Sequence, residues 1–377
     1  MISIQHPASS IKDPGSSIQD PASSIQHPVS RNQLRLVAWE ITRKCNLNCV
    51  HCRAGAERGP YPGELSTAKC LELLEEIREV GTPIVILTGG EPLMREDVFD
   101  LAQKGTDLGL RMVLATNGTL LDPGLVTRMK DSGIKRVSIS IDGADAAQHD
   151  GFRKVPGAYQ SALEGIECLK SGGMEFQINT TVTRHNVGDL EKILELSVGL
   201  GAAAHHIFLL VPTGRAKDML NQEIDALEYE RVLHWFYEMR DQVPLHLKAT
   251  CAPHYYRILR QEAHRKGQKV DVETYGLDAV TRGCLGGTSF VFISNTGIVQ
   301  PCGYLELDCG DLKQSPFPSV WRDSKIFKQL REFSAYKGKC GRCEYMKFCG
   351  GCRARAYEAT GDFLAEEPLC AYEPLRA

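Results

Sequence analysis

Three cysteines lie close together near the start of the chain: Cys45, Cys49 and Cys52, just after an apolar run at residues 34–41. Thiolates at this spacing, on a loop that leaves a strand, can bind three irons of a 4Fe-4S cluster. The fourth iron then has no protein ligand and can bind a small molecule. The spacing therefore predicts a reactive cluster, with a structural zinc site completed by a distant fourth ligand as the alternative.

A second group of cysteines lies in the last quarter of the chain. Close pairs of cysteines can each bind one metal or one edge of a cluster, and the glycines between them relieve the backbone. The expected metal ligands of this group are Cys284, Cys302, Cys340, Cys343, Cys349, Cys352 and Cys370. Spacing alone also allows a zinc ribbon on Cys340, Cys343, Cys349 and Cys352.

Composition narrows the class of protein. The chain has 14 cysteines but no basic-then-apolar signal sequence, which favours metal binding over a disulfide framework. A net charge of -3 without long basic runs predicts that nucleic acid is not a partner. No apolar stretch approaches the roughly 18 residues that span a bilayer. We therefore expect a globular, cytoplasmic protein.

Residues 1–32 form a degenerate seven-residue repeat with a proline in each copy. Proline removes a backbone donor and breaks a helix, so this segment is predicted to be a disordered tail. Its repeat histidines, His6 and His27, are weak candidates for metal binding.

Helical and strand-like patterns alternate after the first cysteine loop. Strands are expected at residues 34–41, 83–87, 111–115, 136–141, 175–182 and 205–210, and helices after Ser66 and at 97–108, 123–132, 157–171 and 188–200. Six β/α units in series predict an α/β fold, a parallel sheet curved into a partial or full barrel. An amphipathic helix at 226–241 is expected to pack against it. The predicted division is the tail at 1–32, the barrel at 33–245 and a cysteine-rich domain at 246–377.

The chemistry of such a fold gathers where the strands end. The second expected strand ends in Thr88-Gly-Gly-Glu-Pro92. Gly89 and Gly90 would let backbone carbonyls approach a ligand ammonium group, and a plain Gly-Gly turn is the alternative. The cysteine triplet follows the preceding strand, and the two motifs together are much more specific than either motif alone.

With these two motifs the chain resembles the radical S-adenosylmethionine (SAM) enzymes over residues 34–215. The resemblance implies that the open iron binds SAM and that the cluster cleaves it to a 5'-deoxyadenosyl radical. It places Gly89, Gly90 and Glu91 near the methionine ammonium group and Ser140 and Arg153 near its carboxylate. The ribose or adenine would meet Asn117, Asn179 and Thr181. Arg153 has a simpler alternative, a surface residue paired with Asp150.

The C-terminal cysteines resemble the SPASM extension of this superfamily, which houses auxiliary iron-sulfur clusters. One departure is that two residues rather than three, Gly350 and Gly351, separate Cys349 from Cys352. This leaves open whether one or two auxiliary clusters form.

Several stretches, among them residues 37–41, 87–95, 251–256, 301–305 and 350–357, are similar to the haem-biosynthesis branch of the family. The resemblance implies oxidative decarboxylation of two propionates of Fe-coproporphyrin III to vinyl groups, giving haem b. It implies SAM, a tetrapyrrole and a flavodoxin- or ferredoxin-type electron donor as partners. The alternatives are a sibling enzyme that removes acetate or propionate side chains from didecarboxysirohaem, a peptide-modifying radical enzyme, and a zinc-stabilised binding protein without enzymatic activity.

A substrate with four carboxylates and an iron needs cations and an axial ligand. The catalytic candidates are His254, Cys251 and Tyr255. Further candidates are His205, His206 and Tyr256 for the iron, and Arg215 and Arg257 for the carboxylates. Strand alternation predicts that His205 and His206 point to opposite faces, and a buried core histidine is an equal alternative.

Overall fold

The computed structural model describes residues 33–375. The predicted disordered tail at residues 1–32, with His6 and His27, lies outside the described residues.

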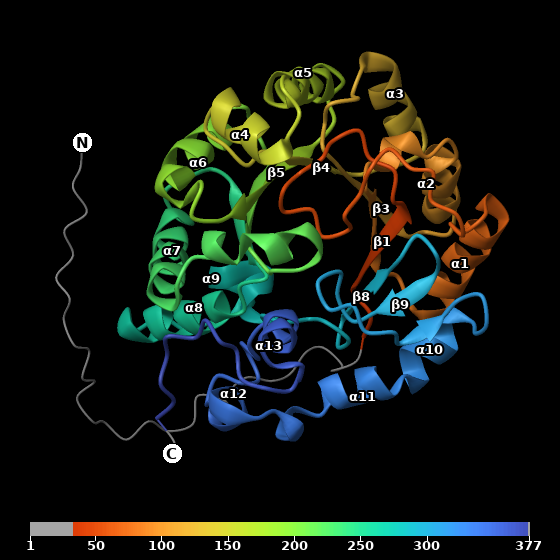
Figure 1. Ribbon diagram of the computed structural model, residues 1–377. Coiled ribbons are helices and arrows are strands. Elements are labelled where there is room, and N and C mark those ends of the chain that lie inside the picture. The colour runs from red at the N-terminus through yellow and green to blue at the C-terminus, as the bar shows by residue number, and fades with distance from the viewer. Residues whose placement is uncertain (1–32, 376–377) are drawn as a thin grey trace.

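The described residues contain a ten-stranded sheet with the order β10-β9-β8-β1-β2-β3-β4-β5-β6-β7. The pairs from β8 through β1 to β7 are all parallel. β7 and β8 do not pair with each other, so the curved sheet is an open barrel (Figure 1). The strands are β1 (Leu36–Thr42), β2 (Ile84–Gly89), β3 (Arg111–Thr116), β4 (Val137–Ser140), β5 (Phe176–Val182), β6 (Ala204–Leu209), β7 (His246–Thr250), β8 (Phe290–Ile293), β9 (Ile298–Gln300) and β10 (Gly310–Asp311). The predicted partial barrel is confirmed.

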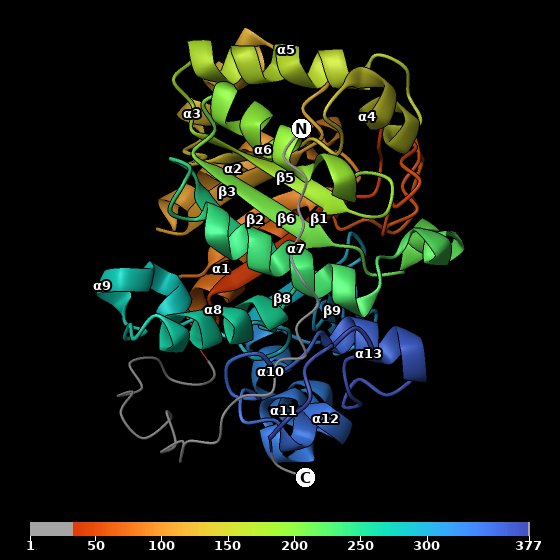
Figure 2. The ribbon, with the colours of Figure 1, turned by 90° about the vertical axis from the view of Figure 1, so that its left-hand side faces the viewer.

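Helices cover the outside of the sheet (Figures 1 and 2). Those of the barrel are α1 (Thr67–Val80), α2 (Val98–Asp107), α3 (Pro123–Asp131), α4 (Ala146–Arg153), α5 (Ala158–Ser171), α6 (Leu190–Gly199) and α7 (Ala226–Met239). Ser66 caps α1 by accepting a hydrogen bond from the Lys69 backbone N–H, as its sequence pattern predicts. The predicted strands β1 to β6 and the predicted helices differ from the observed ones by at most two residues at either end.

α4 is the barrel helix that the sequence patterns did not predict. Four of its eight residues are polar, and Gly151 lies in its interior, so Phe152 is its only large apolar side chain and the segment lacks a clear apolar stripe. Asp145 nevertheless caps it by accepting from the Gln148 backbone N–H. The helix matters because Arg153 lies on its last turn.

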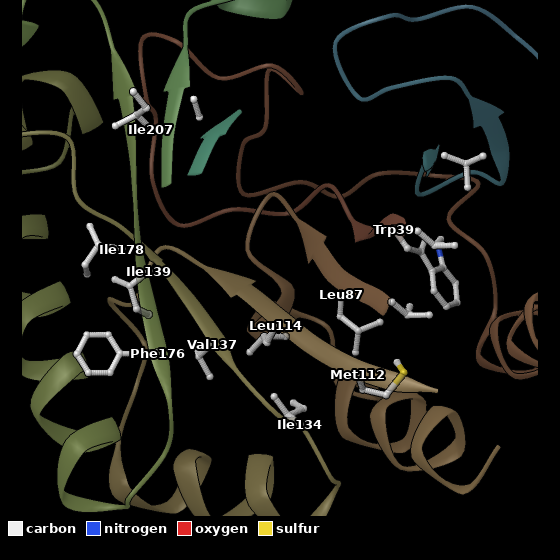
Figure 3. Packing of buried hydrophobic residues seen from close by; sticks show 14 of the residues in the cluster. Trp39, Leu87, Met112, Leu114, Ile134, Val137, Ile139, Phe176, Ile178 and Ile207 are labelled. Carbon is white, nitrogen blue, oxygen red and sulfur yellow. The ribbon is translucent and has the colours of Figure 1, made fainter. Parts of the chain in front are cut away.

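Apolar side chains fill the space between the strands and the outer helices. Figure 3 shows Leu87, Leu114, Ile139, Ile178 and Ile207 in this layer, each almost fully buried. Because side chains alternate along a strand, their neighbours face the barrel interior. Several of these inward residues are polar, and Ser140, Asn179 and His206 lie side by side on β4, β5 and β6.

The cysteine-rich part contributes to the same sheet. β8 pairs in parallel with β1, with Trp39 opposite Ile293. The remaining helices of this part are α8 (His254–Arg265), α9 (Val272–Tyr275), α10 (Phe317–Asp323), α11 (Lys325–Arg331), α12 (Gly338–Arg342) and α13 (Arg353–Thr360). Short 3-10 helices are η2 (Pro92–Met94), η3 (Val187–Asp189), η4 (Gly214–Gln222), η5 (Gly276–Ala279) and η6 (Phe333–Ala335). The division at residue 245 stays a prediction.

Among residues 33–375, no helix combines the length and the apolar character that crossing a bilayer requires.

Candidate radical site and cluster sites

The first three cysteines lie on the loop after β1, across the middle of the arc of strands (Figure 1). The backbone N–H of Leu47 lies 3.4 Å from Cys45 Sγ, and that of Ala56 lies 3.4 Å from Cys52 Sγ. Burial raises the pKa of Cys45 to about 12, so its thiol keeps its proton until a metal replaces it. N–H groups directed at sulfur suit iron-bound thiolates, and the loop therefore fits a cluster.

Arg153 connects this loop to the end of β4. Its Nη1 lies 3.5 Å from Cys49 Sγ, and its guanidinium forms an ion pair with the buried Asp142. Asp142 Oδ1 also accepts from the backbone N–H of Thr181, at 2.7 Å. Asp150 instead accepts from backbone N–H groups of the α4–α5 turn. The alternative of a surface Arg153 paired with Asp150 is wrong, because the guanidinium is buried beside the cysteine loop.

The Gly-Gly-Glu segment packs directly on the backbone of the cysteine loop. The backbone N–H of Gly90 donates to Thr42 O at 2.8 Å, and that of Glu91 donates to Lys44 O at 2.7 Å. A Cβ atom on Gly90 would lie only 2.4 Å from Lys44 O. The glycines therefore permit a close approach to the cysteine loop, a reason that the sequence pattern did not reveal.

The Glu91 side chain joins the ends of β2 and β3. It accepts hydrogen bonds from Thr116 Oγ1 at 2.7 Å and from the backbone N–H groups of Asn117 and Leu93. Burial raises the pKa of this carboxyl to about 7. Asn117 in turn donates to Asn46 of the cysteine loop, at 2.8 Å. Glu91 thus positions Asn117 against the loop.

The other predicted SAM contacts lie at neighbouring strand ends. Ser140 lies opposite Asn179, whose Oδ1 accepts from Gln177 Nε2 at 2.9 Å. Thr181 is linked through Asp142 to Arg153. The structure therefore brings Ser140, Asn179 and Thr181 to the carboxyl ends of β4 and β5, beside the cysteine loop. Their contacts with SAM stay predictions.

Arg215, a candidate for substrate carboxylates, uses most of its donors to support the cysteine loop and leaves its buried Nη2 without a partner. Its Nε donates to Cys49 O at 2.9 Å and its Nη1 to Ala56 O at 3.1 Å, while its backbone N–H donates to Cys52 O at 3.0 Å. The adjacent Gly214 allows this contact, since a Cβ there would lie 2.0 Å from Arg53 O. These bonds fix the loop from the β6 side of the barrel.

The later cysteines divide into two sets. One pocket is lined by Cys340, Cys343, Cys349 and Cys370. The second set brings Cys251, Cys302 and Cys352 into one apolar cluster around Leu305. Cys284 lies near them. Burial is the main cause that raises the pKa of Cys302 and of Cys352, and the charge of the nearby Cys284 raises both pKa values further. The sequence had assigned Cys251 to catalysis, and only the fold places it with cluster cysteines.

The zinc alternatives gain no support from this geometry. Within residues 33–375, no three His, Cys, Asp or Glu side chains converge closely enough to hold one metal ion. Zinc gathers its ligands around a single ion at about 2.0–2.3 Å, whereas a 4Fe-4S cube holds each thiolate on a separate iron. Cys352 also lies apart from the pocket of Cys340, Cys343 and Cys349. Cys352 therefore does not share one pocket with Cys340, Cys343 and Cys349, the other three ligands of the zinc-ribbon alternative.

His254 lies beside the first of these sets. It lines the pocket of Cys340 and its partners, is 1% exposed, and leaves both ring nitrogens without a hydrogen-bond partner. Arg257 lines the same pocket, but it pairs with Glu230 and is therefore not a free cation for substrate.

The remaining candidates lie on β6 and α8. Tyr255 and Tyr256 are buried in the hydrophobic core. His205 faces the outer helices and lies 3.0 Å from Thr180 Oγ1, as a buried core histidine. His206 points to the opposite face, 3.0 Å from Gln177 Nε2, so the predicted alternation is confirmed. The core encloses His205, Tyr255 and Tyr256, and their role as ligands to substrate iron stays a prediction.

Comparisons with known proteins agree with this arrangement. A model described as the radical SAM superfamily matches residues 39–197, and one described as an iron-sulfur cluster-binding SPASM domain matches residues 284–353. A solved structure of SuiB from Streptococcus suis bound to S-adenosylmethionine superposes with a TM-score of 0.71 at 16% identity, over 90% of this chain and 78% of that one. The fold and cysteine sets thus define a radical SAM enzyme with an auxiliary iron-sulfur domain.

Curated relatives narrow the class further. A protein of Nitratidesulfovibrio vulgaris named AdoMet-dependent heme synthase is 58% identical over 91% of this chain and 93% of its own length. A protein of the same name from Methanosarcina barkeri is 52% identical over 91% of this chain and 98% of its own length. The chain belongs to the radical SAM family, in its haem-biosynthesis branch. Its cofactors are SAM and 4Fe-4S clusters.

Proposed function

We propose that this enzyme oxidatively decarboxylates two propionates of Fe-coproporphyrin III to vinyl groups and so produces haem b. The observation that carries the proposal is the 58% identity, over 91% of the chain, to a relative named AdoMet-dependent heme synthase. The cysteine sets of the structure support it, because this reaction needs both a radical source and an acceptor for one electron per propionate.

Within this proposal Cys45, Cys49 and Cys52 hold the radical cluster, which with SAM supplies a 5'-deoxyadenosyl radical. The SAM site consists of Gly89, Gly90, Glu91, Asn117, Ser140, Arg153, Asn179 and Thr181. Glu91 and Arg153 act by holding neighbouring groups against the cysteine loop, through the hydrogen bonds and the ion pair described above. A flavodoxin- or ferredoxin-type protein supplies the reducing electron.

Removal of one hydrogen atom from the β-carbon of a propionate leaves a carbon radical. Loss of carbon dioxide from that radical, together with one electron, gives the vinyl group. An auxiliary cluster would accept this electron, and either Cys340, Cys343, Cys349 and Cys370 or Cys251, Cys284, Cys302 and Cys352 would hold it. The two sites adjoin, since the backbone N–H of Cys284 donates to Cys349 O at 3.2 Å.

The test is to incubate the anaerobically reconstituted enzyme with SAM, a strong reductant and Fe-coproporphyrin III. Mass spectrometry should show a monovinyl intermediate and then haem, with two molecules of 5'-deoxyadenosine formed per haem. Intact porphyrin beside cleaved SAM would overturn the substrate assignment. Conversion of didecarboxysirohaem under the same conditions would identify the sibling reaction instead.

A further inference from the structure

A second pocket adjoins the radical cluster loop. Its volume of about 410 Å³ lies in the range of small-molecule sites. Three parts of the chain meet there: the cysteine loop, the loop after β6, and the segment from β8 to Glu306, which contains Cys302. The lining residues are Arg43, Arg53, Ala54, Gly55, Gly214, Arg215, Asp218, Phe292, Gln300 and Glu306. A ligand in this pocket would touch the segments that carry Cys52 and Cys302.

A buried carboxylate fixes two guanidinium groups in this pocket. Glu40, at the end of β1, is fully buried and accepts from Arg43 Nε at 2.8 Å and from Arg53 Nη2 at 2.7 Å. Arg53 also lies over the ring of Phe292, with 4.3 Å between Cζ and the ring centroid. One carboxylate thus faces two cations, which leaves one positive charge beside the cluster loop.

We propose that Arg43 and Arg53 bind a carboxylate of the tetrapyrrole substrate at this pocket. The inference rests on the proposed function and locates its substrate. Guanidinium groups present several N–H donors in a plane, which matches a carboxylate, and one edge of Arg43 and of Arg53 remains free of Glu40. Arg215 adds a buried Nη2 without a partner at the same pocket. The acidic lining residues, Asp218 and Glu306, are exposed to solvent.

The position of the pocket agrees with the reaction. A propionate held beside Cys52 fixes one edge of the macrocycle near the radical source, and the Cys302 side of the same pocket leads to an auxiliary cysteine set. One substrate pose would therefore serve both the hydrogen abstraction and the removal of the electron. The buried ring of Phe292 holds the Arg53 guanidinium in place on the pocket wall.

Binding can be measured without turnover. Fe-coproporphyrin III is titrated anaerobically into the cluster-loaded enzyme, without SAM or reductant, and followed by the porphyrin absorption bands. R43Q should bind at least tenfold more weakly and R43K less so, since loss of a charge-assisted hydrogen bond lowers affinity by about one to two powers of ten. R43Q should fold, because the Arg43 side chain is 35% exposed and Arg53 still neutralises Glu40. R53Q is the second variant.

Arg58→Gln is the matched control, because Arg58 lies exposed on the same loop and outside the pocket. Iron octaethylporphyrin, which has no carboxylates, should bind wild type and R43Q equally weakly. Equal affinity of wild type, R43Q and R53Q for Fe-coproporphyrin III, or no binding by wild type, would overturn the site. If R43Q binds the porphyrin more weakly but the wild-type enzyme never converts it, the binding site is supported and the proposed reaction is rejected.

Discussion

At the scale of single residues, Arg282 is a buried cation to which the described chain gives no hydrogen-bond partner. All three guanidinium nitrogens are buried and unpaired, and the group lies 3.7 Å above the Phe333 ring. A Cβ on Gly350 would lie 2.0 Å from its Nη2, so Gly350 makes room for it between Cys349 and Cys284. A buried charge needs a partner, and the negatively charged clusters on both sides would supply it.

Replacing Arg282 by Gln should therefore lower the reduction potential of an auxiliary cluster. A cation stabilises the more negative reduced state, and a unit charge about 6 Å away at an effective dielectric constant of 20 is worth on the order of 100 mV. Redox titration followed by electron paramagnetic resonance (EPR) measures this shift at unchanged iron content. The exposed Arg322→Gln is the control. An unchanged midpoint potential would show that Arg282 only packs against Phe333.

Cys251 provides a second test at this scale. Cys251→Ala should remove or alter one auxiliary cluster, because its thiol belongs to the set of Cys302 and Cys352. The expected result is a loss of up to about four irons per chain, with the EPR signal of the SAM-binding cluster retained. Cys168→Ala, on a helix of the barrel, should keep the full iron content. Full iron and unchanged spectra in Cys251→Ala would reject this ligand.

At the scale of elements, the loop after β1 and the end of β2 must fit closely. Gly90→Ala places a methyl group against Lys44 O, and such overpacking costs about 1–3 kcal/mol. We expect lower thermal stability, incomplete loading of the first cluster and at least a tenfold slower SAM cleavage. Gly199→Ala on α6 is the control, since a Cβ there meets no atom within 4 Å. Normal SAM cleavage by Gly90→Ala would contradict the close approach.

The elements that the sequence predicted well are those determined by local patterns. β1 to β6 and helices such as α1, with its Ser66 cap, could be located because apolar periodicity and capping are short-range signals. β8 could not be paired with β1, since about 250 residues separate them and a four-residue strand has little pattern of its own. Among site residues, the cysteines could be predicted from their spacing. The burial of Arg153 could not, because it depends on a helix without a clear apolar stripe.

The same limit applies to residues whose partners come from distant segments. The sequence presents Arg215 and Arg257 as free cations. In the fold, carbonyl groups of the cysteine loop accept from Nε and Nη1 of Arg215, which leaves only its Nη2 without a partner, and Glu230 pairs with Arg257. Conversely, the sequence pattern does not single out Arg43 and Arg53, because their role depends on contacts with Glu40 and, for Arg53, with Phe292, 239 positions away. A site whose residues lie close together on one loop can be predicted from the sequence. A site whose residues come from distant segments of the fold cannot.

At the scale of the whole molecule, the cysteine-rich part and the barrel act as one body around the radical site. β8 extends the barrel sheet, and Asn295 donates to Glu64, which also accepts from the Arg43 backbone N–H at 2.7 Å. The position of the first cluster loop therefore depends on residues that follow the barrel. This arrangement keeps the auxiliary sites at a fixed distance from the proposed substrate pocket, which the proposed electron removal requires.

The two auxiliary sets should nevertheless load independently, because each contributes its own thiols. Cys343→Ala with Cys370→Ala removes ligands from the Cys340 pocket, and Cys284→Ala with Cys302→Ala removes ligands from the Cys251 set. Starting from about twelve irons for three clusters, each double variant should lose about four. If either pair instead abolished both auxiliary EPR signals, the two sets would form one site. Both double variants should still cleave SAM in the absence of substrate. Vinyl formation should stop in the variant that lacks the electron-accepting cluster. The variant that fails to form vinyl groups therefore identifies the cysteine set that accepts the electron.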